Sequence, residues 1–351
     1  MTDRLAARLG TRAVRLLEPE AAHRATVRLM KSPLAPRFRV KSDPSLAVSV
    51  AGLDFPNPVG LAAGFDKNAE VPNAMLGLGF GFVEVGAVTP RPQKGNARPR
   101  VFRLPADDAV INRYGFNNDG LDRIGARLRR RRRRGIVGVN LGANKDSEDR
   151  AEDYVTCLKA LEGLVDFYTV NISSPNTPGL RALQDAKALD DLLRRVLKAR
   201  NGLAGKTPVF LKIAPDLADA DKQDIAAAVK KHKLDALIIS NTTIERPAWL
   251  KGRHAKEKGG LSGRPLFEPS TELLLEFYQA LKGVTPLIGV GGIFSVDDAY
   301  QKITAGASLV QLYTALIYEG PGLVADIVEK LPAKLRAEGF SSLEEAVGSA
   351  L

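Results

Sequence analysis

Short apolar runs alternate with amphipathic stretches through most of this chain, and no other feature restricts its possible folds as strongly. The runs are continuously apolar, which is typical of strands buried on both faces of a parallel sheet. They are residues 58–62, 81–85, 136–141, 167–172, 209–213, 236–240, 287–290 and 309–313. Helical periodicity lies between them, at residues 120–132, 148–164, 190–199, 219–231, 271–281 and 296–305.

Eight strand–helix units in succession favour an α/β fold of the (β/α)8 TIM barrel type. A doubly wound open sheet is the structural alternative, but no Gly-x-Gly-x-x-Gly sequence follows the first strand to support it. Residues 47–50 and 53–55 flank Ala51-Gly52 and predict a hairpin that closes the bottom of the barrel. The long segment from Thr89 to Asn118 is predicted to be a functional loop over the top face, where barrel active sites lie.

Residues 1–40 are predicted to form a basic helical segment ahead of a barrel domain at residues 41–351. Its first helix places two sets of residues on neighbouring faces: Arg4, Arg8, Arg12 and Arg15 on one, and Leu5, Leu9, Ala13 and Leu16 on the other. A second helix is predicted to begin at Pro19 and to end before Pro33. Such helices can lie in a membrane interface, or they can dock on the main domain by their apolar face; the pattern leaves both open.

Composition narrows the class of protein. An apolar fraction of 44% predicts a soluble globular core, and no apolar run is long enough to span a membrane. The N-terminus lacks the apolar region of a signal peptide, so none is expected. Cys157 is the only cysteine, and the three histidines are scattered, so we expect no disulfide and no metal site.

The net charge of +11 raises the question of a nucleic-acid partner. Part of the surplus lies in the first residues and part in the run from Arg129 to Arg134. That run ends a predicted helix, where cations complement the helix dipole. We therefore expect a solvated basic surface and no nucleic-acid partner.

Amides and lysines follow the predicted strands at the end where barrel enzymes carry their chemistry. These residues are Lys67, Asn112, Asn140, Asn171, Lys212 and Asn241. An amide both donates and accepts, so several together can bind the edge of a heterocycle, while a lysine can meet a carboxylate or an electron-rich cofactor. A single asparagine of this kind is more often an ordinary loop residue. Their recurrence at successive strand ends favours a ligand site.

Glycines and hydroxyls add two further indications. Gly289–Gly292 and Tyr313–Thr314 follow the last two strands, the usual phosphate site of a barrel, and predict a phosphate-bearing cofactor. Ser173 and Ser174 lie in a segment interrupted by two prolines and a glycine. A serine is a poor base in water, so it needs a substrate whose C–H bond is weakened by another step, such as hydride removal by a flavin.

Taken together, these motifs resemble the dihydroorotate dehydrogenases over nearly the whole chain. They are AAGFDKN (62–68), NRYGFNN (112–118), NISSPNTPGLR (171–181), KIAPD (212–216), SNTT (240–243), GGLSGRPL (259–266) and GVGGI (289–293). The sequence LEPEAAHR (17–24) resembles the N-terminal extension of the class 2 branch, which is quinone-dependent and membrane-associated. Ser174 agrees, because the class 1 branch has cysteine there.

The resemblance implies oxidation of (S)-dihydroorotate to orotate in pyrimidine (UMP) biosynthesis, with FMN passing electrons to a membrane quinone. It implies peripheral attachment of residues 1–40 to the membrane. The absence of a transit peptide and of a transmembrane helix favours a bacterial protein on the cytoplasmic face of the inner membrane.

The resemblance also implies roles for the residues at matching motif positions. Ser174 would be the catalytic base, taking a proton from C5 of the substrate while the C6 hydride goes to flavin N5. The implied substrate residues are Lys67, Asn112, Arg113, Tyr114, Gly115, Phe116, Asn171, Asn176, Asn241 and Thr242. The implied FMN residues are Ala62, Ala63, Gly64, Phe65, Asp66, Ala87, Asn140, Asn171, Lys212, Ser240, Gly263, Gly292, Tyr313 and Thr314. The implied quinone residues are His23, Arg103 and Tyr313.

Ala87 departs from the family pattern, which commonly has serine or threonine there in contact with the flavin. One hydrogen bond to the cofactor would be lost, a cost of about 0.5–1.5 kcal/mol. We therefore expect Ala87→Thr to tighten FMN binding, measured by fluorescence titration of the apoprotein. Unchanged affinity would contradict this expectation.

Two other functions stay open from the sequence. A dihydrouridine synthase, an FMN barrel that acts on RNA, would suit the basic charge but uses a catalytic cysteine on an active-site loop, and no such cysteine exists here. A catalytically silent barrel that binds membranes would show no substrate-dependent bleaching of flavin. The presence of Lys67, Ser174 and Asn241 argues against this second alternative.

Overall fold

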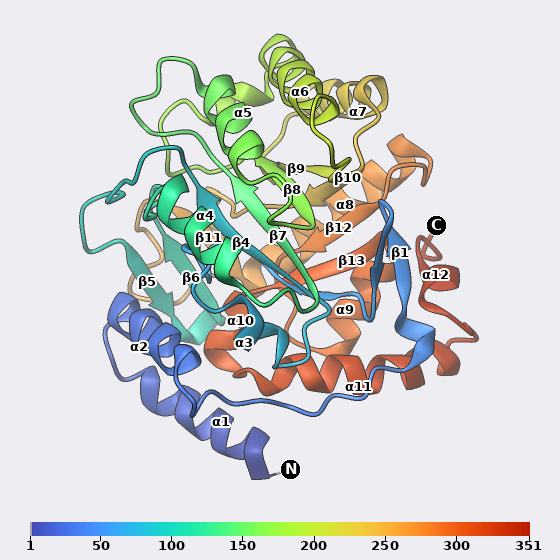
Figure 1. The fold of residues 1–351 in the computed structure, drawn as a ribbon. Coiled ribbons are helices and arrows are strands. Elements are labelled where there is room, and N and C mark those ends of the chain that lie inside the picture. The colour runs from blue at the N-terminus through green and yellow to red at the C-terminus, as the bar shows by residue number, and fades with distance from the viewer. Residues whose placement is uncertain (1) are drawn as a thin grey trace.

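The structure, a computed structural model, describes residues 2–351; Met1 and the side chains of Thr2, Asp3 and Leu5, which belong to the predicted N-terminal helical segment, lie outside the described part. Its centre is a closed parallel barrel surrounded by helices (Figure 1). The barrel strands are β3 (Val59–Leu61), β4 (Phe82–Val88), β7 (Ile136–Leu141), β8 (Phe167–Asn171), β9 (Val209–Ile213), β10 (Ala236–Ile239), β12 (Leu287–Val290) and β13 (Ala307–Leu312). They pair in this order, and β13 returns to β3.

The predicted (β/α)8 fold is confirmed, and the open-sheet alternative is wrong because β13 pairs with β3. Each predicted run overlaps one barrel strand. The predicted helices correspond to α4 (Leu121–Arg130), α5 (Arg150–Ala160), α6 (Ala186–Asn201), α7 (Asp219–His232), α8 (Phe267–Leu281) and α9 (Val296–Thr304). Four further helices were not predicted: α3 (Pro72–Leu76), α10 (Thr314–Tyr318), α11 (Gly322–Ala337) and α12 (Leu343–Ala346).

Aromatic rings fill the bottom of the barrel. Phe167 stacks on Phe210 with ring centroids 4.7 Å apart, and Phe82 meets the edge of Phe167 at 6.1 Å. Glycine at position 138 makes room for this layer, because a Cβ there would lie 2.1 Å from the Phe167 ring. The predicted hairpin, β1 (Val48–Val50) with β2 (Leu53–Phe55), closes the layer, since Phe55 packs against Phe82 at the start of β4.

The segment from Thr89 to Asn118 is more regular than the predicted loop. Its strands β5 (Val101–Leu104) and β6 (Ala109–Asn112) pair antiparallel, and β11 (Gly260–Gly263) joins them in a small sheet. Leu104, Ile111 and Leu261 are fully buried in a core of their own beneath it. This sheet brings Asn112 and Gly263 to the same end of the barrel as the strand termini.

The N-terminal segment forms α1 (Thr2–Val14) and α2 (Pro19–Lys31), as predicted. Helix α1 lies beside α10 and α11, and α2 lies beside β5 (Figure 1). Arg4 pairs with Glu329 and Arg8 with Glu319, whereas Leu9 is 54% and Leu16 is 89% exposed. Docking of α1 by its leucine face, one of the two predicted options, is therefore wrong for the described side chains. Among the described residues, none belongs to a helix with the length and apolar character needed to cross a bilayer.

The run from Arg129 to Arg134 is exposed, as predicted, except for Arg131. The side chain of Arg131 is 4% exposed and donates a hydrogen bond of 3.2 Å to the Asn73 amide oxygen. Five of the six arginines are thus ordinary surface residues, in the last turn of α4 and directly after it.

Candidate active site

One continuous cavity of about 670 Å³ extends from the helices α1 and α2 to the carboxyl ends of the barrel strands. Nearly all the predicted site residues line it, including those assigned to substrate, cofactor and quinone. Asp66 and Arg113 are the exceptions. Asp66 is buried below the cavity and accepts hydrogen bonds from the backbone N–H groups of Glu70 and Val71, which fixes the loop after β3. Arg113 turns outward, forming an ion pair of 2.8 Å with Glu257.

A chain of buried polar side chains forms the floor of the cavity. Asn140 donates to Glu84 at 2.6 Å, and Asn171 donates to the Asn140 oxygen at 2.8 Å. Ser173 donates to the Asn171 oxygen at 2.8 Å, and Asn241 donates to Ser173 at 3.0 Å. These residues come from β4, from β7, from β8 with the loop after it, and from the loop after β10, so each amide is held in one orientation by its neighbour.

Lys67 is the cation nearest the predicted substrate residues. Its ammonium donates to the Gly64 carbonyl and lies 4.2 Å from the centroid of the Tyr114 ring. Burial lowers the pKa of Lys67 to about 8; the nearby Arg100 guanidinium reinforces this effect, and Glu20 and Asp66 oppose it. Lys67 is therefore a charged group at neutral pH that can lose its proton under mildly alkaline conditions.

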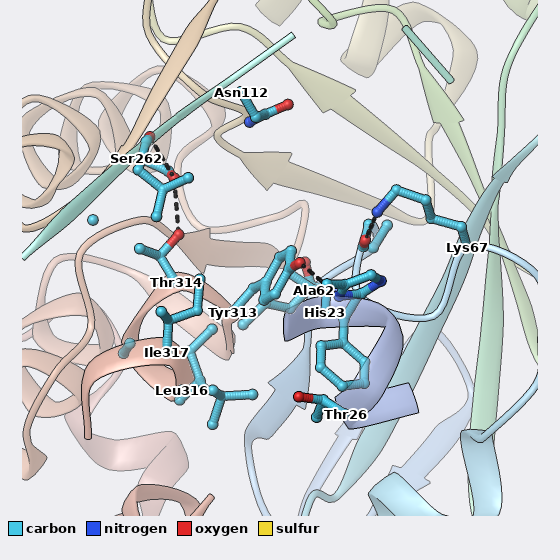
Figure 2. Close-up of a pocket in the computed structure, with 18 of the residues that line it drawn as sticks. His23, Thr26, Ala62, Lys67, Asn112, Ser262, Tyr313, Thr314, Leu316 and Ile317 are labelled. Atoms are coloured by element: carbon cyan, nitrogen blue, oxygen red, sulfur yellow. Dashed lines mark hydrogen bonds between the residues drawn. The ribbon is translucent and has the colours of Figure 1, made fainter. Parts of the chain in front are cut away.

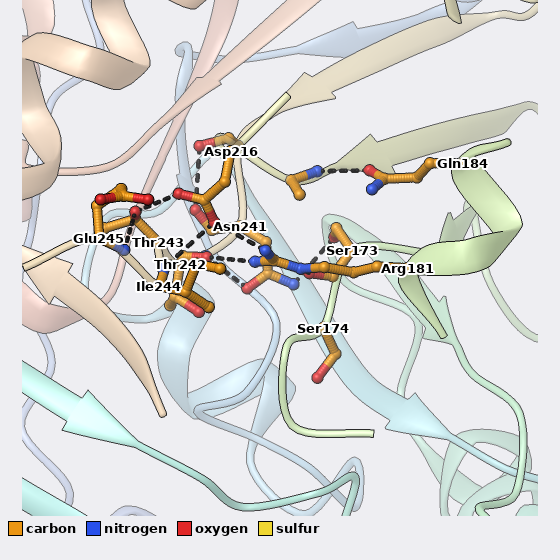
Figure 3. A network of polar contacts seen from close by, with 12 residues as sticks. Ser173, Ser174, Arg181, Gln184, Asp216, Asn241, Thr242, Thr243, Ile244 and Glu245 are labelled. Atoms are coloured by element: carbon orange, nitrogen blue, oxygen red, sulfur yellow. Dashed lines mark hydrogen bonds and ion pairs between the residues drawn. The ribbon is translucent and has the colours of Figure 1, made fainter. Parts of the chain in front are cut away.

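The Ser174 side chain lies on the loop that follows β8 and is 6% exposed, facing the cavity. Arg181 holds this loop from behind, as Figure 3 shows: it donates to the Ser173 carbonyl at 3.1 Å and to the Thr242 carbonyl at 3.0 Å. Arg181 also forms an ion pair of 2.8 Å with Asp216, which follows β9. One guanidinium thus joins the loops after β8, β9 and β10.

The opposite end of the cavity has glycines and hydroxyls. A Cβ at Gly292 would lie 2.4 Å from the Phe267 Cβ, and one at Gly263 would lie 2.2 Å from the Asp108 carbonyl oxygen. Only glycine fits these positions, and it leaves backbone N–H groups accessible to a ligand. Ser262 and Thr314 share a hydrogen bond of 2.8 Å at the same end (Figure 2).

His23 of α2 enters the cavity from the N-terminal helices (Figure 2). Its Nδ1 lies 3.4 Å from the Tyr313 hydroxyl, and its ring meets the edge of Phe65 at a centroid distance of 5.4 Å. Burial, and then the Lys67 ammonium, lower the pKa of His23 to about 3, so the imidazole is neutral. Arg103 donates to the Arg15 and Leu17 carbonyls and so fixes the turn between α1 and α2.

Comparison with known proteins identifies the family. The family model "Dihydroorotate dehydrogenase" matches residues 45–335. The chain is 57% identical over 335 residues to the dihydroorotate dehydrogenase (quinone) of Parvibaculum lavamentivorans, covering 95% of both chains. It is 55% identical to that of Erythrobacter litoralis, covering 96% of this chain and 97% of the relative.

This chain belongs to the dihydroorotate dehydrogenase family. A crystal structure of the Eimeria tenella dihydroorotate dehydrogenase in complex with ferulenol superposes with a TM-score of 0.92, at 40% identity, over 95% of this chain and 96% of that one. The ligand-free enzyme of the same organism gives 0.91, over 95% of this chain and 99% of that one.

A dihydroorotate dehydrogenase carries a flavin, and the cavity fits one. Its glycine end can receive a phosphate on backbone N–H groups. Its middle is bounded by Ala62, Ala87 and the amides of Asn140 and Asn171. Lys212 also lines it, and burial lowers the pKa of this lysine while Glu84 opposes the effect. A buried cation beside hydrogen-bonding amides suits a ring system that becomes electron-rich on reduction.

Several residues of this dihydroorotate dehydrogenase site were missed in the sequence. Glu84 and Gln311 are fully buried on the floor, where Gln311 donates to Glu84 at 2.5 Å. An acid within the apolar strand 82–88 was the available signal for Glu84, because an acidic residue is rarely buried without a partner. Arg181 gave no such signal, since its partners come from three separate segments of the chain.

Cys157 bears on the dihydrouridine synthase alternative, which requires a cysteine on an active-site loop. It is fully buried within α5 and does not line the cavity. Burial raises the pKa of its thiol, so the side chain serves packing.

Proposed function

We propose that this chain oxidises (S)-dihydroorotate to orotate with FMN as the bound cofactor, passes the electrons to a membrane quinone, and so serves pyrimidine biosynthesis. The observation that carries the proposal is the continuity of the cavity. It joins the strand-end residues Ser174 and Asn241 with His23 and the N-terminal helices. Two substrates of opposite character, a polar pyrimidine and an apolar quinone, can thus reach one flavin from different sides.

The pyrimidine site would lie between Lys67 and the Ser174 loop. Lys67 would meet the substrate carboxylate, and Asn112, Asn176 and Asn241 would bind the ring amides. Ser174 would accept the proton from C5 as its own hydroxyl proton passes outward toward solvent, while the bound flavin would supply the hydride acceptor. With the substrate between the two groups, Lys67 orients it and Ser174 moves the proton.

The FMN site would extend along the carboxyl ends of the barrel strands. Gly263, Gly292 and Thr314 would hold the phosphate, and Ser240 and Asn140 would contact the ring. The Arg113 side chain is not part of this proposal, since it pairs with Glu257 outside the cavity.

Residues 1–40 would form the quinone-access segment, with residues 41–351 as the FMN-binding barrel. Five leucines of this segment are exposed: Leu9, Leu16, Leu17, Leu29 and Leu34. Arginines flank them, so the surface suits insertion among anionic headgroups without crossing the bilayer. We propose peripheral attachment to the cytoplasmic face of a bacterial inner membrane, with His23, Arg103 and Tyr313 beside the quinone.

Anaerobic spectroscopy on the purified yellow protein tests the proposal. Dihydroorotate should bleach the flavin absorbance, and a soluble quinone should restore it where fumarate or NAD does not. An unbleached flavin would refute the dehydrogenase activity. Reoxidation by fumarate or NAD at the quinone rate would refute the assignment of the electron acceptor.

A further inference from the structure

Glu20 is a buried acid in the first turn of α2, between two arginines of the barrel domain. Its carboxylate is 7% exposed and accepts two hydrogen bonds from Arg100, at 3.0 Å from Nε and 2.8 Å from a terminal nitrogen. Arg98 donates a third, at 2.8 Å. Arg100 is itself only 5% exposed. This is a bidentate pair shielded from solvent, the kind of ion pair whose loss leaves a buried charge uncompensated.

Arg100 uses its remaining nitrogen on the segment that precedes the substrate residues. It donates to the Lys94 carbonyl at 2.7 Å and to the Asn96 carbonyl at 3.0 Å. The Asn96 amide in turn donates to the Arg113 and Asn176 carbonyls, both at 3.0 Å. The turn held by Arg100 therefore bridges the segment at 112–116 and the loop that carries Ser174.

A second path runs through Tyr114. The Arg100 guanidinium lies 5.3 Å from the centroid of this ring, and the Lys67 ammonium lies 4.2 Å from it. Both cations are thus close to one aromatic ring, and the nearest carboxylate that pairs with either is Glu20. The charge of Glu20 offsets that of Arg100 in the immediate surroundings of Lys67.

We propose that Glu20, although it belongs to the helix that carries the quinone residue His23, is a positioning residue for dihydroorotate. It acts through Arg100, which fixes Asn96 and Tyr114 and thereby the cradle of Lys67, Asn176 and Ser174. The inference rests on the proposed function. It gives the N-terminal segment a role in the first half-reaction, before any quinone is involved.

A positioning role for Glu20 predicts a change in the pH dependence of ligand binding, which a purely structural role would not cause. The groups facing Lys67 are Arg100, Glu20, Asp66, His23 and the Tyr114 ring. His23 is neutral, so Glu20 and Asp66 alone oppose the repulsion by Arg100. Removing the charge of Glu20 lowers the pKa of Lys67 further below its present value of about 8. The ammonium is then lost at a lower pH, and so is the affinity for an anionic pyrimidine.

The test uses Glu20→Gln in the flavin-loaded full chain, with Glu319→Gln as the matched control. Glu319 also joins the N-terminal helices to the barrel, through Arg8, but has no contact with Arg100. Orotate dissociation constants are measured from the flavin spectrum over a pH series, and flavin bleaching by dihydroorotate is followed in stopped flow. We expect Glu20→Gln to weaken orotate binding on the order of tenfold, as for a lost charge-assisted hydrogen bond. The pH midpoint of orotate binding should move below that of the parent protein, while Glu319→Gln leaves both unchanged.

Two further variants keep the test decisive. Glu20→Asp retains the charge and should restore the pH midpoint. Should Glu20→Gln not retain flavin, Arg100→Lys replaces it. This variant keeps the positive charge but loses both the bidentate contact with Glu20 and the nitrogen that reaches the Lys94 and Asn96 carbonyls, so weak orotate binding is again expected. Orotate affinity and pH midpoint equal to those of the parent protein would overturn the inference. Failure of the parent protein itself to bleach with dihydroorotate would instead overturn the proposed function.

Discussion

The proposed chemistry depends on Ser174. Its oxygen accepts a hydrogen bond of 3.3 Å from the Asn176 N–H, and the side chain is almost completely enclosed. The proposed proton transfer depends on the substrate rather than on a base beside Ser174, because removal of the hydride makes the adjacent proton of the substrate acidic. Proton transfer to a positioned side chain typically contributes a factor of about 10² to 10⁴.

We therefore predict that Ser174→Ala slows flavin reduction by dihydroorotate about 10²- to 10⁴-fold. Orotate should still bind with nearly the parent affinity, since Lys67 and the amides remain. Stopped-flow absorbance under nitrogen gives the rate, and equilibrium titration gives the affinity. A rate within threefold of the parent protein, taken as roughly the margin of ordinary context effects, would exclude Ser174 as the base.

The second residue-scale prediction concerns pH. Lys67 is charged below its pKa of about 8 and neutral above it, so the proposed contact with the substrate carboxylate requires the acidic side of that value. Affinity for orotate should be constant below that value and fall as the pH rises through it. Lys67→Gln should bind weakly and without this pH dependence. A parent protein whose orotate affinity stays constant through mildly alkaline pH would show that Lys67 does not hold the carboxylate.

At the scale of elements, the loop after β8 depends on Arg181. The Arg181 side chain is 21% exposed and the Asp216 side chain is 11% exposed. The two residues follow different strands of the barrel. Removal of the arginine would leave two backbone carbonyls without this donor and would take from Asp216 its charged partner, although the Thr243 hydroxyl and the Ile244 N–H still donate to that carboxylate. The loops after β8 and β10 would then be free to separate.

Arg181→Ala is accordingly predicted to lower the free energy of unfolding by about 3 kcal/mol, the lower end for a broken buried pair because both side chains keep some exposure. Urea denaturation measures this change as a lower midpoint. Arg195→Ala is the control. This arginine pairs with three acids, Asp149, Glu152 and Asp191, but its partners are largely exposed, and a change below about 1 kcal/mol is expected. Equal effects of the two variants would argue against the clamp.

Much at this scale was predictable from sequence. Buried parallel strands are apolar throughout, so the eight runs marked the barrel, and the motifs at their ends marked the cavity. Strands β5 and β6 were missed because prolines and arginines dilute the alternation that defines an exposed strand. Glu20 and Arg100 were missed because they are 80 residues apart in the chain. Only the fold brings these two residues together, so no local sequence pattern indicates that they pair.

The whole molecule presents an apolar surface at one corner, made by the exposed leucines of residues 9–34. Figure 1 shows α1 and α2 there, beside the N-terminus and apart from the layer of α5, α6 and α7. The cavity is lined by residues of the same two helices. A lipid-soluble substrate would pass from the bilayer into the cavity without entering water.

Replacing Leu16 and Leu34 together with glutamate should reduce binding to vesicles that contain anionic lipid. The two side chains are 89% and 83% exposed, so their loss costs the fold little while removing apolar contact with lipid. Co-sedimentation measures the bound fraction. Val284→Glu is the matched control, because Val284 is 81% exposed elsewhere on the barrel. Undiminished binding of the leucine variant would locate the lipid contact outside this surface.

The burial of Cys157 makes site-specific labelling of the N-terminal helices practical. A thiol with a raised pKa inside a packed helix reacts slowly with maleimides, and this chain has no other cysteine. Leu34→Cys would therefore create a single reactive thiol without any prior removal of native ones. A polarity-sensitive fluorophore attached there would report directly on the moment at which the N-terminal helices meet lipid, and on whether substrate in the distant cradle alters that contact.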